Sequence, residues 1–377
     1  MVFAPVSTGA AVVCMFLSFA FWGAHPILRR IAPDVDGAAY SLLMFAGEGL
    51  WAIFLCTVLG ELKAGGSAST FLNSTSGWTE FTVALSNTKS IWILAGGAFV
   101  GAGDFVLPIV MSYIPASIAF PTVAGVCLMF GTVINVAIDG SEKPVFLYTG
   151  LFFALAGVVC LAYGQSKNVD ATEAPDSGSM VTVEMVIVGE KHGQKVGVVT
   201  SPLDAEKEST RGKTMQWILL LIIMGINNSA WGPLSTVGRS GSDGITDAYP
   251  AFMLLELGRV GIQVLTHLIY NGCSCYKKLG RRGTFAMARA AKRRDVGIAF
   301  LNGAFVSMGY FCYFLSSSIV NKAAAFAVSN CSPLFTVFLG VCLLRELKNY
   351  TAEAKKIVAI AIVLYATAIS FLTMAAV

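Results

Sequence analysis

Two stretches, WGAHPILRRIAPDVDGAAYSLLMFAGEG at residues 22–49 and WGPLSTVGRSGSDGITDAYPAFMLLELG at residues 231–258, decide the fold of this chain. At a constant offset of 209 residues they are identical at eight of 28 positions, with no gap. The identical pairs are Trp22/Trp231, Gly23/Gly232, Arg30/Arg239, Asp34/Asp243, Ala39/Ala248, Tyr40/Tyr249, Met44/Met253 and Gly49/Gly258. Small residues often match between apolar helices, so the Trp, Tyr, Arg and Asp identities carry the inference. They indicate an internal repeat.

The whole chain is apolar. Of its 377 residues 55% are hydrophobic and 13% are charged, whereas soluble domains are about 25% charged. Ten continuous apolar runs are each close to the roughly 20 residues that a helix needs to cross a bilayer. The runs are residues 8–28, 38–59, 91–113, 117–138, 145–163, 215–237, 248–270, 296–320, 323–344 and 357–377. Continuous rather than alternating apolarity predicts helices and not a β-barrel. We therefore expect an all-α membrane protein with ten transmembrane helices.

The repeat divides these helices into two sets of five. A second match, at an offset of 206, aligns residues 97–105 with 303–311 at six of nine positions. We expect a first five-helix repeat at residues 1–164, a mobile cytosolic linker at 165–214 and a second five-helix repeat at 215–377. Because five is odd, the second set enters the membrane from the opposite side. Such inverted repeats are typical of transporters with a site near the midplane and two alternating openings.

Lysine and arginine residues are distributed unevenly between the two sides. Connections on one side contain 20 of the 26, connections on the other contain five, and Arg259 lies inside a run. The positive-inside rule then predicts that both termini are non-cytoplasmic. The sequon at Asn73 falls on the non-cytoplasmic side, so we expect glycosylation there. We expect a multi-pass integral membrane protein of the plasma membrane, with an internal membrane as the alternative.

Four charged residues lie inside the apolar runs: Glu48, Asp104, Glu256 and Arg259. A charge at membrane depth costs at least about 2.5–3.5 kcal/mol and usually faces the bundle interior or a watery cavity. Asp104 and Glu48, both beside glycines, are candidates for binding substrate or a proton; a structural hydrogen bond is the alternative. Glu256 and Arg259 are three residues apart on one helix face and can pair. They form either a structural ion pair or a pair whose arginine recognises an anionic or carbonyl-bearing substrate.

Neutral polar and aromatic residues complete the candidate substrate site. They are Trp22, His25, Asn227, Asn228, Trp231 and Tyr310. The inverted repeat places Trp22 toward the cytosolic end and Trp231 toward the opposite face, as gate or stacking positions or, alternatively, as interfacial anchors. Buried amides need hydrogen-bond partners, so this set suits a hydroxyl- or amide-rich solute.

The remaining features limit the function further. The three histidines are dispersed and no Cys/His spacing fits a metal, and no hydrolase constellation is present. We expect neither an enzyme nor a cofactor. The basic segment at residues 277–294 is suited either to contact with anionic lipids or to acting as a topology signal alone. A net charge of +4 indicates no nucleic-acid partner, and the oligomeric state stays open.

Several strings carry a family resemblance. They are Phe130-Gly131-Thr132, then Asn135, Asp139-Gly140, and a fifth helix containing Gly150 and Gly157. Together with the five-plus-five organisation, they resemble the ureide permease and sugar-uptake branches of the drug/metabolite transporter superfamily. The resemblance does not extend to the Walker-like string in the linker of the ureide permeases, because Lys207 stands where the first glycine is needed. It implies a ten-helix carrier of a sugar, a ureide or a nucleobase.

The expected function is therefore secondary transport of a small polar organic solute by alternating access, with protons as the candidate coupling ion. Two alternatives stay open. One is a nucleotide-sugar exchanger of an internal membrane, in which Arg259 would meet phosphate. The other is a non-transporting membrane receptor or scaffold that uses the 165–214 loop to bind partners.

Overall fold

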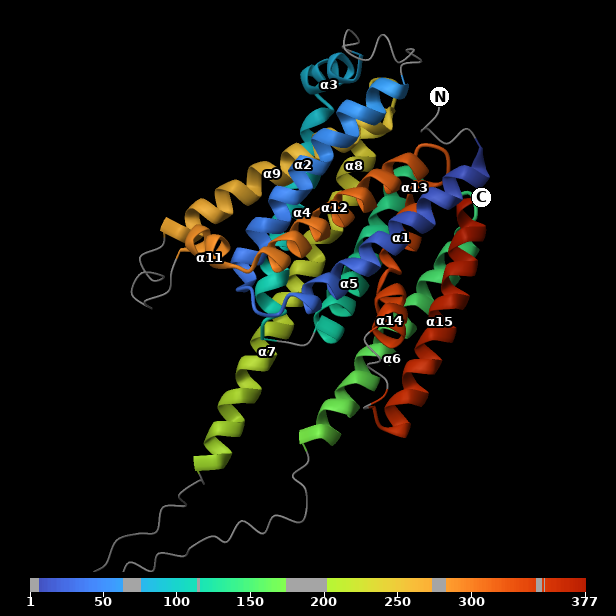
Figure 1. Cartoon of the computed structure of the whole chain (residues 1–377). Helices are drawn as coiled ribbons and strands as arrows, with labels where there is room; N and C mark the ends of the chain where they lie inside the picture. The colour runs from blue at the N-terminus through green and yellow to red at the C-terminus, as the bar shows by residue number, and fades with distance from the viewer. Residues whose placement is uncertain are drawn as a thin grey trace, which may run out of the picture.

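A computed structural model describes residues 7–63, 76–113, 116–173, 202–272, 283–343, 348 and 350–377. Across these residues the regular secondary structure is helical, and Figure 1 shows the helices packed side by side as one bundle. The helices are α1 (Thr8–Ile31), α2 (Gly37–Lys63), α3 (Ser76–Ser86), α4 (Ser90–Val110), α5 (Ala116–Asp139), α6 (Pro144–Glu173), α7 (Pro202–Ser229), α8 (Trp231–Arg239), α9 (Ala248–Gly272), α11 (Thr284–Ala290), α12 (Arg293–Ser316), α13 (Lys322–Asn330), α14 (Pro333–Cys342) and α15 (Ala352–Ala376).

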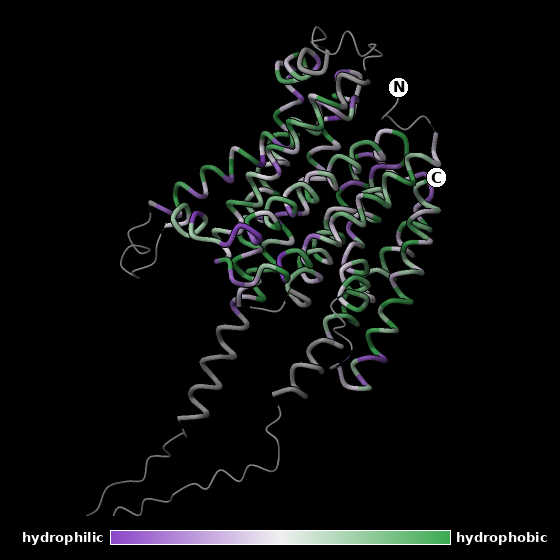
Figure 2. The backbone as a smooth tube through the Cα atoms, viewed as in Figure 1, coloured by the Kyte–Doolittle hydropathy of each residue, from purple (hydrophilic) through white to green (hydrophobic). Residues whose placement is uncertain are grey.

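Ten stretches of the described chain are long and apolar enough to cross a membrane, and they coincide with the ten runs expected from the sequence. Eight of them lie within single helices: α1, α2, α4, α5, α6, α9, α12 and α15. The other two are each built from two helices in succession, α7 with α8 and α13 with α14. Figure 2 shows the outer helix α15 as hydrophobic over most of its length. These features are those of a multi-pass integral membrane protein.

Side-chain caps define the ends of several helices. The hydroxyl of Ser7 accepts a hydrogen bond from the amide of Ala10 at the start of α1, at 3.2 Å. At the start of α15, the hydroxyl of Thr351 accepts one from the amide of Ala354, at 3.1 Å. Each cap satisfies one of the amides that the first turn of a helix leaves without a partner.

Two spans are interrupted near their middles. α7 ends at Ser229 and α8 begins at Trp231, while α13 ends at Asn330 and α14 begins at Pro333. Proline lacks an amide hydrogen, so Pro333 is suited to the first turn of a helix and not to the middle of one. Interrupted spans in transporters bring polar groups to the depth of the substrate site.

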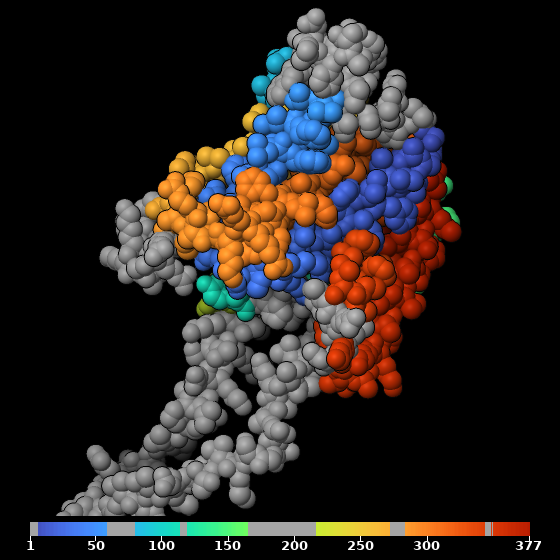
Figure 3. Space-filling model, in the orientation of Figure 1, coloured from blue at the N-terminus to red at the C-terminus, as the bar shows by residue number. Residues whose placement is uncertain are grey.

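Helices α4 and α12 each pack most extensively against two other helices of the bundle. α4 packs on α9 and α12 packs on α2; α4 packs on α8 and α12 packs on α1. α6 packs along α15. Figure 3 shows α1 beside α12 on one face of the molecule, with α14 and α15 next to it.

Glycines make the closest of these contacts. A Cβ atom on Gly97 of α4 would overlap the carbonyl oxygen of Leu255 on α9. A Cβ atom on Gly303 of α12 would overlap the carbonyl oxygen of Met44 on α2. Small residues at such positions let helix backbones approach closely.

Some expectations from the sequence concern residues outside the described ranges. These are Asn73, the linker residues 174–201 and the first part of the basic segment, 273–282. Within the expected linker at 165–214, α6 continues to Glu173 and α7 already begins at Pro202. The helical part of the chain therefore extends beyond the apolar runs at both ends of that linker.

Candidate functional site

The four charged residues of the apolar runs meet at one point. The Nη2 atom of Arg259 lies 2.9 Å from Oε2 of Glu48 and 2.7 Å from Oδ2 of Asp104. Its Nη1 atom lies 2.7 Å from Oε1 of Glu256. The guanidinium also lies 4.4 Å from the centre of the Tyr310 ring. We call Glu48, Asp104, Glu256 and Arg259 the Arg259 cluster.

The Arg259 cluster has more negative than positive groups. Its three carboxylates and one guanidinium would carry a formal charge of −2 if all were ionised. The side chains of Arg259 and Glu48 are 0% and 1% exposed, so water screens this charge poorly. Oε1 of Glu48 and Oε2 of Glu256 are buried and have no hydrogen-bond partner within the described part of the chain. A buried excess charge is unfavourable, so the cluster favours bound protons.

Close packing of α4 against α9 places these charges together. A Cβ atom on Gly101 would lie 2.9 Å from the Cα of Arg259, so α4 has room for only a glycine here. One turn further along α4, Asp104 reaches Arg259 across the interface. From α2, Glu48 approaches the same guanidinium, and Glu256 reaches it from the preceding turn of α9.

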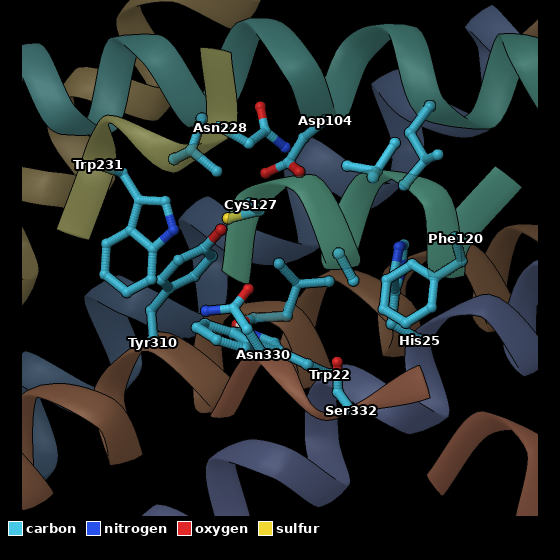
Figure 4. Close-up of a pocket in the computed structure, with 15 residues that line it drawn as sticks. Trp22, His25, Asp104, Phe120, Cys127, Asn228, Trp231, Tyr310, Asn330 and Ser332 are labelled. Atoms are coloured by element: carbon cyan, nitrogen blue, oxygen red, sulfur yellow. Dashed lines mark hydrogen bonds between the residues drawn. The ribbon is translucent and has the colours of Figure 1, made fainter. Parts of the chain in front are cut away.

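A cavity of about 70 Å³ lies beside the Arg259 cluster. Its volume admits a few water molecules, since one water needs roughly 10–15 Å³ of such space. The lining residues are Trp22, His25, Val100, Asp104, Leu107, Phe120, Val123, Ala124, Cys127, Asn228, Trp231, Val306, Tyr310, Asn330 and Ser332. In Figure 4, Asp104 and Asn228 lie on one side of the cavity, with Trp231 and Tyr310 toward one end and His25 and Phe120 toward the other. Both interrupted spans contribute polar groups, Asn228 from α7 and Asn330 from α13.

Three aromatic rings pack together at the Trp231 end of the cavity. The ring centres of Trp22 and Trp231 are 5.7 Å apart, and those of Trp22 and Tyr310 are 4.8 Å apart. The sequence predicts Trp22 and Trp231 toward opposite sides of the membrane, as gate or stacking positions, and in the structure their rings are in contact. Each lies only roughly 4–5 Å along the helix axis from the middle of its span, and side chains as large as indole bridge that separation.

His25 belongs to a polar chain that joins three helices. Its Nδ1 atom lies 2.9 Å from the amide oxygen of Asn302, and the amide nitrogen of Asn302 donates to the hydroxyl of Tyr40 at 2.7 Å. The chain connects α1, α12 and α2 and fixes the ring that lines the cavity. The imidazole also packs against the ring of Phe120 in a T-shaped arrangement, with 5.9 Å between the ring centres.

The two neighbouring asparagines have different positions. Asn228 lines the cavity. Asn227 does not; its amide donates to the backbone carbonyl of Phe99 on α4. Asn227 therefore links α7 to α4 by a hydrogen bond, and Asn228 faces the cavity.

The structure separates the expected site residues into two connected groups. Asp104 and Tyr310 belong to both, because they line the cavity and contact Arg259. Glu48, Glu256 and Arg259 lie behind them, outside the cavity lining. The contact between Asp104 and Arg259 joins residues 155 positions apart, which no spacing in the sequence indicates.

Some residues that line the cavity are not among the site residues expected from the sequence. Ser332 and Phe120 are examples, and each directly precedes a proline, Pro333 or Pro121. A proline within an apolar run marks a break or kink in the helix, where polar groups are accessible. Pro121 and Pro333 are therefore the feature of the sequence that could have indicated Phe120 and Ser332. Among the described residues, no group of three or more His, Cys, Asp or Glu is arranged to hold a metal ion.

Comparison with known proteins shows a fold and no family. No family model matches the chain, and no curated protein matches it. One solved crystal structure, described only as a protein, is similar with a TM-score of 0.55 and 13% identity, covering 98% of this chain and 98% of that one. Likeness at this identity extends to the fold alone.

Proposed function

We propose that the chain is a proton-coupled secondary transporter that moves a small polar organic solute by alternating access. The observation that carries this proposal is the position of Asp104. It lines a cavity at the centre of the bundle and also binds the guanidinium of a buried cluster with excess carboxylates. A carboxyl group that both lines the cavity and contacts the Arg259 cluster is suited to exchange a proton when the solute binds or leaves.

The charge balance supports proton coupling. Two bound protons make the Arg259 cluster neutral, with one carboxylate left to pair with the guanidinium. When Asp104 is the ionised group, it is held by Arg259 at 2.7 Å. When Asp104 is protonated, it can turn its hydroxyl toward a solute in the cavity, and Glu48 or Glu256 becomes the partner of Arg259. Loading the solute and moving a proton are then parts of one rearrangement.

The lining of the cavity supports a neutral, hydrogen-bonding solute. Asn228 and Asn330 offer amide donors and acceptors, and Trp22, Trp231 and Tyr310 offer ring surfaces. Sugars, ureides and nucleobases combine flat or apolar faces with polar edges, which suits such a site. The resemblance to the ureide permease and sugar-uptake branches of the drug/metabolite transporter superfamily points to the same classes.

Paired helix contacts support two inverted repeats of five spans. Exchange of the halves replaces α4 by α12, α9 by α2 and α8 by α1, so the contacts of α4 with α9 and α8 correspond to those of α12 with α2 and α1. The ion pairs follow the same exchange. Asp34 binds Lys292 before α12, at 2.9 Å, and its repeat partner Asp243 approaches Lys89 before α4, at 3.8 Å. Under this symmetry, the two ion pairs lie at opposite faces.

The orientation follows from charge. With 20 lysines and arginines on one side, we place that side in the cytosol, both termini outside it, and the protein in the plasma membrane. The described basic residues of the 277–294 segment then lie on the cytosolic side, where they can contact anionic lipid; they are Arg289, Lys292, Arg293 and Arg294.

A nucleotide-sugar exchanger is less well supported. Such a carrier needs a cationic group free to meet phosphate, and Arg259 is 0% exposed with three carboxylates around it. Phosphate would have to displace these carboxylates and add negative charge to a site that already has an excess.

Uptake by the purified protein in liposomes tests the proposal. A panel of labelled sugars, nucleobases, ureides and nucleotide sugars is offered with and without an inward proton gradient. We expect uptake of one neutral class, strengthened by the gradient. Uptake of nucleotide sugars alone, without an effect of the gradient, would contradict both the solute class and the coupling, and no uptake of any solute would favour the receptor alternative.

A further inference from the structure

A line of buried polar side chains continues from the Arg259 cluster along α9. Gln263 is 0% exposed and His267 is 1% exposed. The amide oxygen and nitrogen of Gln263 and both ring nitrogens of His267 have no hydrogen-bond partner among the described residues. Four polar atoms without a partner on two adjacent turns are costly, because each buried polar group left unsatisfied costs about 1–3 kcal/mol.

The spacing of these residues forms a continuous path. Arg259, Gln263 and His267 follow at intervals of four residues, which places them on one face of α9 with a rise of about 6 Å per step. At the far end, the side chain of Asn271 donates to the carbonyl of His267 and accepts from the amide of Thr284 at the start of α11. The path therefore runs from the Arg259 cluster to the end of α9.

The surroundings of His267 connect it to the same cluster. Its ring packs against Phe105 of α4, at 4.9 Å between centres, and against Phe45 of α2, at 6.4 Å. The nearest carboxylates along those two helices are Asp104, next to Phe105, and Glu48, one turn from Phe45. Both belong to the Arg259 cluster, so the two helices whose rings pack against His267 also carry carboxyl groups of the cluster.

We propose that Gln263 and His267 form a proton route, completed by ordered water, between the Arg259 cluster and the α9 end of the protein. The route rests on the proposed function and adds the path by which its coupling proton enters or leaves. Buried waters typically bind groups that are otherwise unsatisfied, with about three hydrogen bonds each. The unpartnered atoms of Gln263 and His267 are suited to hold such waters in a row.

Proton transfer along this route is balanced at each step. A water on one side gives a proton to one nitrogen of His267, and the other nitrogen gives its proton to a water on the far side. One proton leaves the ring for each proton that enters, so no net charge stays on it, and rotation of the ring about its Cβ–Cγ bond restores the starting orientation of its N–H group. The solute cavity and the proton route then meet at Asp104, which lines the cavity and belongs to the Arg259 cluster.

The test measures how fast protons reach the cluster, without any solute. The protein in lipid nanodiscs is mixed rapidly with D2O, and the shift of the infrared C=O band of protonated carboxyl groups as protons exchange for deuterons is followed in time. The difference from Glu48→Gln assigns the part of the band that comes from the cluster. We expect His267→Gln and Gln263→Leu each to slow this part at least tenfold. His267→Gln keeps a polar side chain of similar reach but cannot relay a proton, so it separates relay from packing.

Leu268→Phe is the matched control, because residue 268 lies on the same turn with its side chain 58% exposed. It is expected to retain the wild-type rate. A wild-type rate in His267→Gln would overturn the route, whether or not the protein transports a solute. Slow exchange in His267→Gln together with no uptake of any solute by the wild-type protein would support the route and refute the transport proposal, so the two failures are distinguishable.

Discussion

Arg259→Met removes the only basic group of the Arg259 cluster and leaves three buried carboxyl groups. In the proposed wild-type state, two bound protons neutralise the cluster and one carboxylate pairs with Arg259. Without the guanidinium, the third carboxyl group must also be protonated. A carboxyl group with the ordinary Glu pKa of about 4.3 needs about 3.7 kcal/mol for protonation at pH 7 and about 1 kcal/mol at pH 5. We therefore expect Arg259→Met to lose about 3.7 kcal/mol of unfolding free energy at pH 7.

The sign of the pH effect follows from proton binding. The folded variant holds three protons in the cluster and the folded wild type holds two, while the same carboxyl groups are ionised in both unfolded chains at pH 7. Lowering the pH therefore stabilises the variant relative to wild type. About 2.7 kcal/mol of the loss is recovered between pH 7 and pH 5. The assay is unfolding in mixed micelles with increasing denaturing detergent, followed by far-ultraviolet circular dichroism at both pH values.

Two further variants make the result specific. Arg294→Met removes an exposed arginine before the apolar part of α12 and should change the unfolding free energy by less than about 0.5 kcal/mol at either pH. The double variant Arg259→Met with Glu256→Gln removes one carboxyl group and should regain most of the loss. The reasoning is refuted if Arg259→Met is as stable as wild type at pH 7, or if its loss is the same at pH 5.

The close contact of α4 and α9 predicts that Gly97→Ala is destabilising in the same unfolding assay, since its Cβ would overlap the carbonyl of Leu255. Gly261→Ala, with nothing within 4 Å, should be neutral or stabilising by up to about 1 kcal/mol, and equal losses in the two variants would contradict the packing. The proposed orientation predicts that Asn73 acquires a glycan in microsomes, read as a mobility shift on a gel. A second sequon, Asn349-Tyr350-Thr351, falls on the cytosolic side in this orientation and should stay unmodified. Modification at Asn349 instead would reverse the orientation.

The number and position of the spans could be predicted because bilayer crossing depends on local composition. Ten runs of apolar residues became ten spans, and Glu256 and Arg259 pair as their spacing on one helix allows. The interruption at Ala230 was not predicted, although Asn227, Asn228 and Ser229 directly precede it and Pro233 follows it. Such residues do not identify a break by themselves, because α1, α4 and α5 each continue through a proline. Local patterns indicate where a helix can exist and give less information on where it is interrupted.

The assembly of the site could not be predicted, because it depends on contacts between distant helices. Asp104 has no basic neighbour in sequence, yet Arg259 lies 2.7 Å from it. Likewise, the sequence predicts Trp22 and Trp231 toward opposite sides of the membrane, and the structure places their ring centres 5.7 Å apart. Both results depend on the approach of helices at glycines such as Gly97 and Gly101, and a glycine-rich run indicates close packing without naming the partner.

Solute-dependent proton movement is the most direct test of the proposed coupling at Asp104. Liposomes that contain the protein and an internal pH-sensitive dye are given the transported solute without an imposed proton gradient. The account predicts that adding solute acidifies the interior of wild-type liposomes, and that Asp104→Asn exchanges labelled for unlabelled solute without acidification. Equal acidification by the wild type and Asp104→Asn would contradict the account.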